Sequence, residues 1–317
     1  NSNNIVTSVS IPEEVKYIGE SAFYNATELR TINYPGSEAQ WNAIVKETNW
    51  DYNAGSETVR ETYNLICNYG SINYVSNGDG TCYVNGFIGG GEGTSSDVEI
   101  QSKSPIGDTV ISVRGFMGKA LETVRVPATV TSIDNDAFRQ CDALTNVIFA
   151  DNSQLKNIGK YAFSGCGKLK NIEIPASVVS IGKEAFRYCD RFTNITIPSG
   201  VTSIEEYTFD ECWNLKEVTF GADSKLTSIG RCAFSWCPSL KEIVIPATVV
   251  SIEYGAFNQC DGLVRVAFEE NSKLESIGIS AFDSCMDLGT VKNIPSSLIS
   301  IGKYAFSDCY DLSIYYC

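Results

Sequence analysis

Cysteine is the residue whose type and spacing first suggest chemistry in this 317-residue chain. The chain has 12 cysteines and no histidine. Without histidine, Ser-His-Asp and Cys-His nucleophile systems and His-liganded metal sites are excluded. Eight of the cysteines each follow a phenylalanine by three residues, and these are Cys141, Cys166, Cys189, Cys212, Cys237, Cys260, Cys285 and Cys309.

These eight cysteines recur once per repeat and do not form the CxxC pairs that are typical of zinc sites. A residue type that occupies one repeat position forms a column in a stacked array, and a free cysteine behaves as a small buried apolar residue. We predict a column of reduced, buried thiols, because parallel side chains in a column rarely meet disulfide geometry. Cys67 and Cys82 lie outside the column and could form a disulfide, whereas Cys232 and Cys317 are expected to be unpaired.

A second group of side chains with possible chemistry is acidic. Four carboxylates fall within seven residues, namely Glu205, Glu206, Asp210 and Glu211. Converging oxygens could bind calcium, and a carboxylate pair could hydrolyse a glycoside. No DxDxDG loop is present, and nothing selects one pair over the others. We interpret the group as a solvated acidic edge, and we expect no catalytic residue, no metal site and no cofactor.

The cysteines belong to a repeat. Phe163, Phe186 and Phe209 follow one another at intervals of 23 residues, and other intervals are usually two residues longer. In the copy Leu240–Cys260, LKEIVIPATVVSIEYGAFNQC, alternating apolar residues indicate a short strand, which ends at a proline because proline has no N–H to donate. A second apolar pair predicts an opposite wall, and Ala256–Phe257 predicts a turn of helix or 3-10 helix.

One such coil cannot bury its own apolar edge, so the copies must stack. The sequence predicts a β-rich, right-handed solenoid of short strands and short helical or 3-10 turns. We expect repeat sequence in 1–35, an inserted or capping segment in 36–115, and about nine repeats in 116–317. Within 36–115 we expect a short helix whose apolar stripe is Trp41, Ile44 and Val45, capped by Ser37 with Gln40 three residues on. A β-hairpin is expected around the turn NGDG, and the loop GGGEGTSSD (89–97) lacks the features of a phosphate site, so we interpret it as a linker.

Charge and hydropathy exclude several classes of partner. The net charge is −14 and the pI is about 4.5, so phosphate backbones repel the chain and nucleic acid is not an expected partner. No apolar run approaches the roughly 18 residues of a membrane span, so no membrane insertion is expected. The chain begins and ends inside a repeat, and we therefore expect a mature or trimmed portion of a longer protein.

The pattern LxxIxIPxxVxxIGxxAFxxC resembles the leucine-rich repeats of BspA-like surface proteins, often called type 5 leucine-rich repeats. The resemblance covers most of 6–35 and 116–317. It implies a secreted or cell-surface bacterial protein, often an adhesin, that binds host extracellular matrix or plasma proteins such as fibronectin and fibrinogen. The chain departs from such proteins in showing no LPxTG-type motif, lipobox or cell-wall module.

Two sets of side chains are candidates for ligand binding. Solenoids bind through outward strand positions, which here include Arg125, Asn146, Asn171, Glu173, Asn194, Thr196, Glu217 and Glu242. Aromatic residues also flank the cysteine column, namely Tyr188, Trp213, Trp236 and Tyr310. We hypothesise a non-enzymatic, adhesin-like binding protein; the alternative is a carbohydrate- or mucin-binding module that uses the aromatic rim. Each set also has a purely structural explanation, as a solvated sheet face and as packing over the corners.

Overall fold

The computed structural model describes residues 8–12, 15–23, 29, 31–34, 41, 43–47, 64–67, 72–87, 97–104 and 107–316. The chain divides into two compact units. The first comprises Asn1–Thr94 and Gln101–Ser112, and the second comprises Ser95–Ile100 and Val113–Cys317. Strand β9 (Thr109–Arg114) contains residues of both. Each unit is described by itself.

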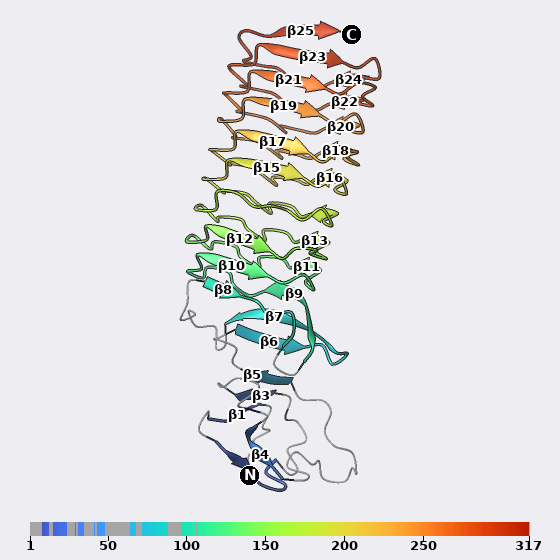
Figure 1. Cartoon of the computed structure of the whole chain (residues 1–317). Coiled ribbons are helices and arrows are strands. Elements are labelled where there is room, and N and C mark those ends of the chain that lie inside the picture. The colour runs from blue at the N-terminus through green and yellow to red at the C-terminus, as the bar shows by residue number, and fades with distance from the viewer. Residues whose placement is uncertain are drawn as a thin grey trace, which may run out of the picture. The chain divides into compact units, whose positions relative to one another are not determined.

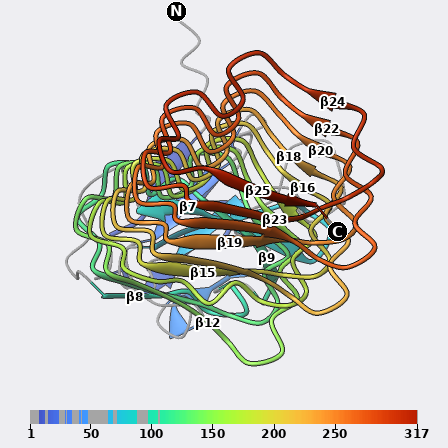
Figure 2. The ribbon, with the colours of Figure 1, turned by 90° about the horizontal axis from the view of Figure 1, so that it is seen from above.

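The second unit is a solenoid of stacked coils, each coil being one sequence repeat (Figures 1 and 2). Its first wall consists of parallel strands β8 (Asp97–Glu99), β10 (Thr123–Val126), β12 (Asn146–Phe149), β15 (Asn194–Ile197), β17 (Glu217–Phe220), β19 (Glu242–Ile245), β21 (Arg265–Phe268), β23 (Thr290–Ile294) and β25 (Ser313–Tyr316). Its second wall consists of two-residue strands β11 (Ser132–Ile133), β13 (Asn157–Ile158), β14 (Ser180–Ile181), β16 (Ser203–Ile204), β18 (Ser228–Ile229), β20 (Ser251–Ile252), β22 (Ser276–Ile277) and β24 (Ser300–Ile301). The predicted β-solenoid is therefore confirmed.

Alternation along the strands decides which side chains enter the core. In β10, Val124 and Val126 are buried and Arg125 is exposed. The parallel register then aligns equivalent positions of successive coils, as where Val124 pairs with Val147. Inward residues therefore form apolar columns, and outward residues form the surface of the first wall.

The central column is a stack of phenylalanine rings. Neighbouring ring centroids are 5.1 to 5.5 Å apart and the planes are within 10° of parallel. The stack contains Phe116, Phe138, Phe163, Phe186, Phe209, Phe234, Phe257, Phe282 and Phe306. Such rings bury a large apolar area, so the column is the main source of cohesion between coils.

The cysteine column lies beside the phenylalanine column, as predicted. All eight thiols are free; seven are fully buried and Cys309 is half-buried. Each Sγ donates to the carbonyl oxygen of the phenylalanine of the preceding coil at 3.0 to 3.3 Å. Cys232 is likewise free and Cys317 lies outside the described residues. Cysteine thus provides a small buried side chain whose S–H donates to a main-chain carbonyl oxygen.

The expected helical or 3-10 turn at the Ala-Phe position is wrong, since residues 107–316 contain no helix. In the Phe257 coil, Gly255 and Gln259 have positive φ angles of 60° and 57°, which interrupt any helical run. The N–H groups of Gly255, Phe257 and Gln259 donate to the following coil, whereas Ala256 N donates back to Glu253 O at 3.3 Å. At the corner, main-chain N–H groups therefore donate alternately within a β-turn and to the next coil.

The described residues of the first unit include three small groups of strands. Strands β1 (Ser8–Ser10), β3 (Thr31–Tyr34) and β5 (Asn64–Cys67) are parallel, as are β2 (Tyr17–Ile18) and β4 (Val45–Lys46). Strands β6 (Ile72–Ser76) and β7 (Thr81–Phe87) form an antiparallel hairpin around the turn NGDG. The buried core includes Ile11, Ile18, Leu29, Ile32, Tyr34, Trp41 and Ile44.

The apolar stripe expected for the short helix is wrong at one position. Trp41 and Ala43 are helical, and Trp41 and Ile44 are buried. Val45 instead lies in β4, in register with Tyr17 of β2, and its side chain is 61% exposed. The expected cap, Ser37 with Gln40, and most of the loop 89–97 lie outside the described residues.

The disulfide that the sequence allowed between Cys67 and Cys82 is not formed. Cys82 is a free, fully buried thiol whose Sγ lies 3.7 Å from Asp108 O. The side chain of Cys67 lies outside the described residues. Within the described chain, no group of three or more metal-binding side chains occurs, and no helix is long and apolar enough to cross a bilayer.

Candidate binding surface

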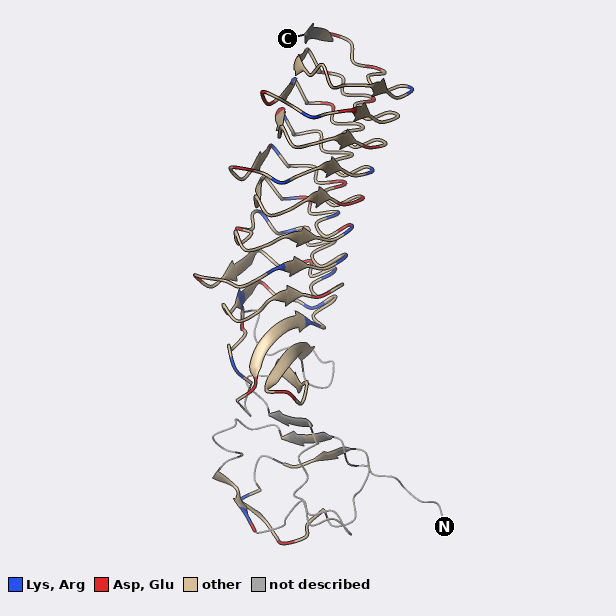
Figure 3. Cartoon of the chain, turned by 90° about the vertical axis from the view of Figure 1, so that its right-hand side faces the viewer, with Lys and Arg blue, Asp and Glu red and all other residues tan. Residues whose placement is uncertain are grey.

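The outward side chains of the first wall are mostly small and polar, and they form contacts along their columns. Thr196 and Thr219 share a hydrogen bond of 2.8 Å, and Arg265 forms an ion pair with Glu242 at 3.4 Å. Arg125 is exposed on β10. Figure 3 shows acidic and basic residues interspersed along the coils. Ala267, at an outward position of β21, is only 5% exposed, because it is small and lies in register between Val244 and Lys292.

The first wall is interrupted at residues 171–174. This segment occupies the strand position of the Phe186 coil but forms no strand, and no strand arrow stands between β12 and β15 in the first wall in Figure 1. Ile172 still points inward and is buried, whereas Asn171 and Glu173 are exposed. The segment therefore keeps the repeat's side-chain pattern and has lost its main-chain pairing.

Proline explains why pairing fails here. In three coils the residue after the strand has an N–H that donates to the last carbonyl of the preceding strand: Ala150 to Val126, Gly221 to Ile197 and Glu269 to Ile245, at 2.8 to 3.1 Å. Proline has no N–H. The junctions without strand pairing in the described range 144–316 are those where Pro175, Pro198 or Pro246 holds this position. A proline does not prevent pairing by itself, since β8 and β10 pair ahead of Pro127.

Two surface hollows lie on either side of segment 171–174. The larger, of about 640 Å³, lies between β12 with its following turn and residues 171–177. The smaller, of about 420 Å³, lies between residues 171–174 and strands β15 and β17. Six candidate residues from the first wall line these hollows: Asn146, Asn171, Glu173, Asn194, Thr196 and Glu217. Arg125 and Glu242 line neither.

The same region of the second wall is also unpaired. Strand β14 ends one sheet and β16 begins another, and no backbone hydrogen bond joins these two strands. The Phe186 and Phe209 coils are instead joined at the phenylalanine corner, where Glu184 N, Phe186 N and Tyr188 N donate to the next coil. Away from this corner, the bond from Thr193 N to Lys170 O also joins the two coils, whereas the ion pairs are concentrated at the corner.

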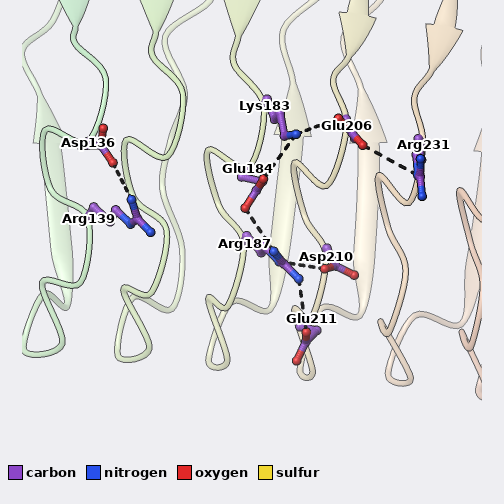
Figure 4. A network of polar contacts seen from close by, with 9 residues as sticks. All are labelled: Asp136, Arg139, Lys183, Glu184, Arg187, Glu206, Asp210, Glu211 and Arg231. Atoms are coloured by element: carbon purple, nitrogen blue, oxygen red, sulfur yellow. Dashed lines mark hydrogen bonds and ion pairs between the residues drawn. The ribbon is translucent and has the colours of Figure 1, made fainter.

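Arg187 is the centre of this ion-pair network (Figure 4). Its guanidinium lies 2.9 Å from Asp210 and 3.7 Å from Glu211 of the next coil, and 3.1 Å from Glu184 of its own coil. It also lies over the rings of Tyr188 and Tyr207, at 4.5 and 5.1 Å from their centroids. Lys183 adds a further bond between the coils, to Glu206 at 2.8 Å.

The acidic group is thus not a solvated edge, and that interpretation is wrong for Asp210 above all. Asp210 is only 3% exposed. Burial raises its pKa to about 6, although Arg187 acts in the opposite direction. Asp210 is buried because the corner turn places its side chain, directly after Phe209, against Arg187 of the preceding coil. Of the four carboxylates only Glu205 is exposed, and it accepts a hydrogen bond of 2.5 Å from Ser203.

The structure separates the four rim aromatics into different environments. Trp213 and Trp236 are neighbours, with ring centroids 5.8 Å apart and planes at 42°, and they are 44% and 41% exposed. Tyr188 instead covers Arg187. Tyr310 lies several coils farther along and is 72% exposed. Only the tryptophan pair therefore offers a joint aromatic surface.

Comparisons with known proteins agree with the fold. A family described as the BspA type leucine-rich repeat region matches residues 1–44, 109–226 and 227–316, in six copies. A leucine-rich repeat protein from Bacteroides ovatus is 28% identical, with a TM-score of 0.60 over 78% of this chain and 70% of that one. The leucine-rich repeat protein of T. pallidum is 23% identical, with a TM-score of 0.50 over 74% and 97%. A comparison with curated proteins found no match.

Proposed function

The chain belongs to the BspA-type leucine-rich repeat family, and from this premise we propose that it is a non-enzymatic, adhesin-like protein that binds an extracellular protein through its first wall. Repeat solenoids of this kind bind along regular, exposed strand positions. The observation that carries the proposal is the pair of adjacent hollows at segment 171–174. They lie where two successive junctions of the first wall are unpaired, and so provide shape where the paired coils provide only a flat grid.

The electrostatics of the hollows favour a polar or basic ligand surface. The charged residues that line them are Asp151, Glu173 and Glu217, and no lysine or arginine does so. A partner surface with lysine or arginine would complement these carboxylates and be steered by them. Location outside the cell, either secreted or at the bacterial surface, is part of the proposal and is supported by the family.

A binding screen with a matched pair of variants tests this proposal. The immobilised protein is presented with extracellular matrix and plasma proteins, including fibronectin and fibrinogen. For any ligand found, Glu173→Arg should weaken binding by at least about tenfold, because it introduces repulsion between the hollows. Glu242→Arg is the control, since it reverses an equivalent exposed charge outside both hollows. Equal effects of the two variants, or an empty screen, would contradict the proposal.

The tryptophan pair supports a second candidate, a carbohydrate- or mucin-binding surface. Exposed aromatic faces can stack on sugar rings. A glycan array and a mucin-binding assay should then lose signal with Trp213→Ala and with Trp236→Ala. Tyr304→Ala removes a similarly exposed ring elsewhere and is the control. Binding that survives both tryptophan variants would eliminate this candidate.

A further inference from the structure

We propose that the larger hollow takes an extended segment of the partner polypeptide, which adds as a strand to the open edge of β12 and carries lysine or arginine at alternate positions. This inference rests on the proposed function and names the class of partner. β-Strand addition requires three features: unpaired main-chain groups at a strand edge, space beside them and complementary side chains. Each is present at β12.

The unpaired main-chain groups belong to Val147 and Phe149. In a parallel ladder, alternate residues turn their N–H and C=O groups to opposite sides. Asn146 N and Ala150 N donate toward β10, to Glu122 O and Val126 O. Val147 and Phe149 therefore turn their main-chain groups away from β10. Both residues line the larger hollow, and Val147 does so although its side chain is buried.

No neighbouring coil satisfies these groups. Among the described residues, no hydrogen bond joins β12 to segment 171–174, and Phe149 O receives no donor because Pro175 has no N–H. The space beside them, about 640 Å³, is the larger of the two hollows. The smaller hollow is bounded at one end by the bond from Thr193 N to Lys170 O, so it is the less suitable site.

The surrounding side chains specify the composition of the added strand. Alternate side chains of a strand point to opposite faces. Those on the outer face of the added strand would lie beside Asp151 and Glu173, the two charged residues of the larger hollow. Those on the inner face would lie against buried residues such as Val147 and Ile172. A basic residue on the outer face alternating with a β-branched one on the inner face fits both.

Synthetic seven-residue peptides that alternate lysine with valine test the proposal by fluorescence anisotropy with the full chain. A peptide that alternates glutamate with valine is the charge control. Two further lysine–valine peptides have every second amide N-methylated, in one phase or in the other. We expect saturable binding of the unmethylated lysine peptide, at least about tenfold weaker binding of the glutamate peptide, and a similar loss for at least one methylated phase. Full affinity in both methylated phases, or no binding of the lysine peptide, would overturn strand addition.

Variants of the chain locate the peptide. Glu173→Gln should weaken the lysine peptide by about three- to tenfold, whereas Glu242→Gln should leave it unchanged. Pro175→Ala restores a donor to Phe149 O and should also weaken the peptide, because it closes the edge that the peptide needs. If a protein from the binding screen depends on Glu173 but no lysine peptide binds, the proposed function survives and strand addition is wrong. If neither binds, both fail.

Discussion

The side-chain amide of Asn293 donates a hydrogen bond of 3.2 Å to the carbonyl oxygen of Phe268, the last residue of β21. In three other coils the equivalent carbonyl accepts from a main-chain N–H, but here the residue after the strand is Pro295. β21 and β23 remain paired from Arg265 to Ala267, and the pairing of β23 with β25 is irregular around Asn293, whose φ is 59°. One extra residue therefore replaces the donor that proline lacks.

Removing this amide should weaken the β21–β23 junction. We expect Asn293→Ala to lower the free energy of unfolding by about 1 kcal/mol, because one hydrogen bond to a strand end is lost. Amide hydrogen exchange in β23 should become faster. Asn146→Ala is the control, since that amide bonds only to the exposed hydroxyl of Thr145. Unchanged exchange in β23 would show that Asn293 does not maintain the pairing.

Adding a donor at segment 171–174 is the reciprocal experiment. In Pro175→Ala, the new N–H should donate to Phe149 O and become protected from hydrogen exchange. The net change in unfolding free energy should stay within about 1 kcal/mol, because the bond gained is offset by the entropy that alanine adds to the unfolded chain. Pro246→Ala should behave alike, with Phe220 O as acceptor. Rapid exchange at both new amides would refute the role assigned to proline.

The phenylalanine column should be the most sensitive part of the core. Phe186 is fully buried between Phe163 and Phe209. We expect Phe186→Ala to cost about 3–5 kcal/mol, through lost burial and a cavity. Phe186→Leu fills more of the space and should cost clearly less. Chemical denaturation measures both, and equal costs for the two changes would show that cavity volume is not the cause.

The thiol column should make stability fall at alkaline pH. Burial raises the pKa of Cys141 and Cys309 to about 11 and that of Cys260 to about 12. An unfolded thiol ionises near pH 8.5. The unfolded state therefore loses protons first, and stability should decrease as the pH rises from about 8.5 toward 11.

A thiol-reactive dye gives the matching measurement at pH 8. The column cysteines should be unreactive in the folded protein and reactive after denaturation, because the buried thiols are neutral and inaccessible. Rapid labelling of the buried column in the folded state would contradict the assignment.

Asp210 should give a dependence of the same sign in the acidic range. Its folded pKa of about 6 lies above the value of about 3.9 expected when unfolded. The folded state therefore keeps the proton longer, and the contribution of Asp210 to stability should fall as the pH rises from about 4 to 6 and then stay level. The slope cannot exceed about 1.4 kcal/mol per pH unit for one group.

Comparison with Asp210→Asn isolates that effect. The difference in unfolding free energy between the two proteins should vary between pH 4 and 6 and be constant above. Asp283→Asn changes a carboxylate one residue after Phe282, at the equivalent position of another coil, and serves as the control. A constant difference for Asp210→Asn across the range would show that Asp210 does not titrate there.

The sequence by itself determined the solenoid and its core. A repeat in which phenylalanine, cysteine and the strand residues recur at fixed positions can bury its apolar side chains only by stacking, so periodicity is sufficient to place Phe186 and Cys189 inside. It did not determine the corner conformation. Whether Ala256–Phe257 starts a helix depends on where each N–H finds an acceptor, and that acceptor lies in the next coil.

The candidate site was divided in the same way. The outward positions followed from alternation along the strands, but the pattern treated Asn171 and Glu173 like their equivalents in every other coil. A signal was present, since Pro175 and Pro198 are the only prolines within 116–317 that hold the position after the first-wall strand in two successive coils. Segment 171–174 is left unpaired because, among the described residues, no other group donates to the strand-end carbonyl at either of its junctions. In β23, by contrast, the side-chain amide of Asn293 donates to Phe268 O in place of the missing N–H. The burial of Asp210 against Arg187 likewise required the stacking of two coils, because a carboxylate 23 residues from its partner has no local trace of that contact.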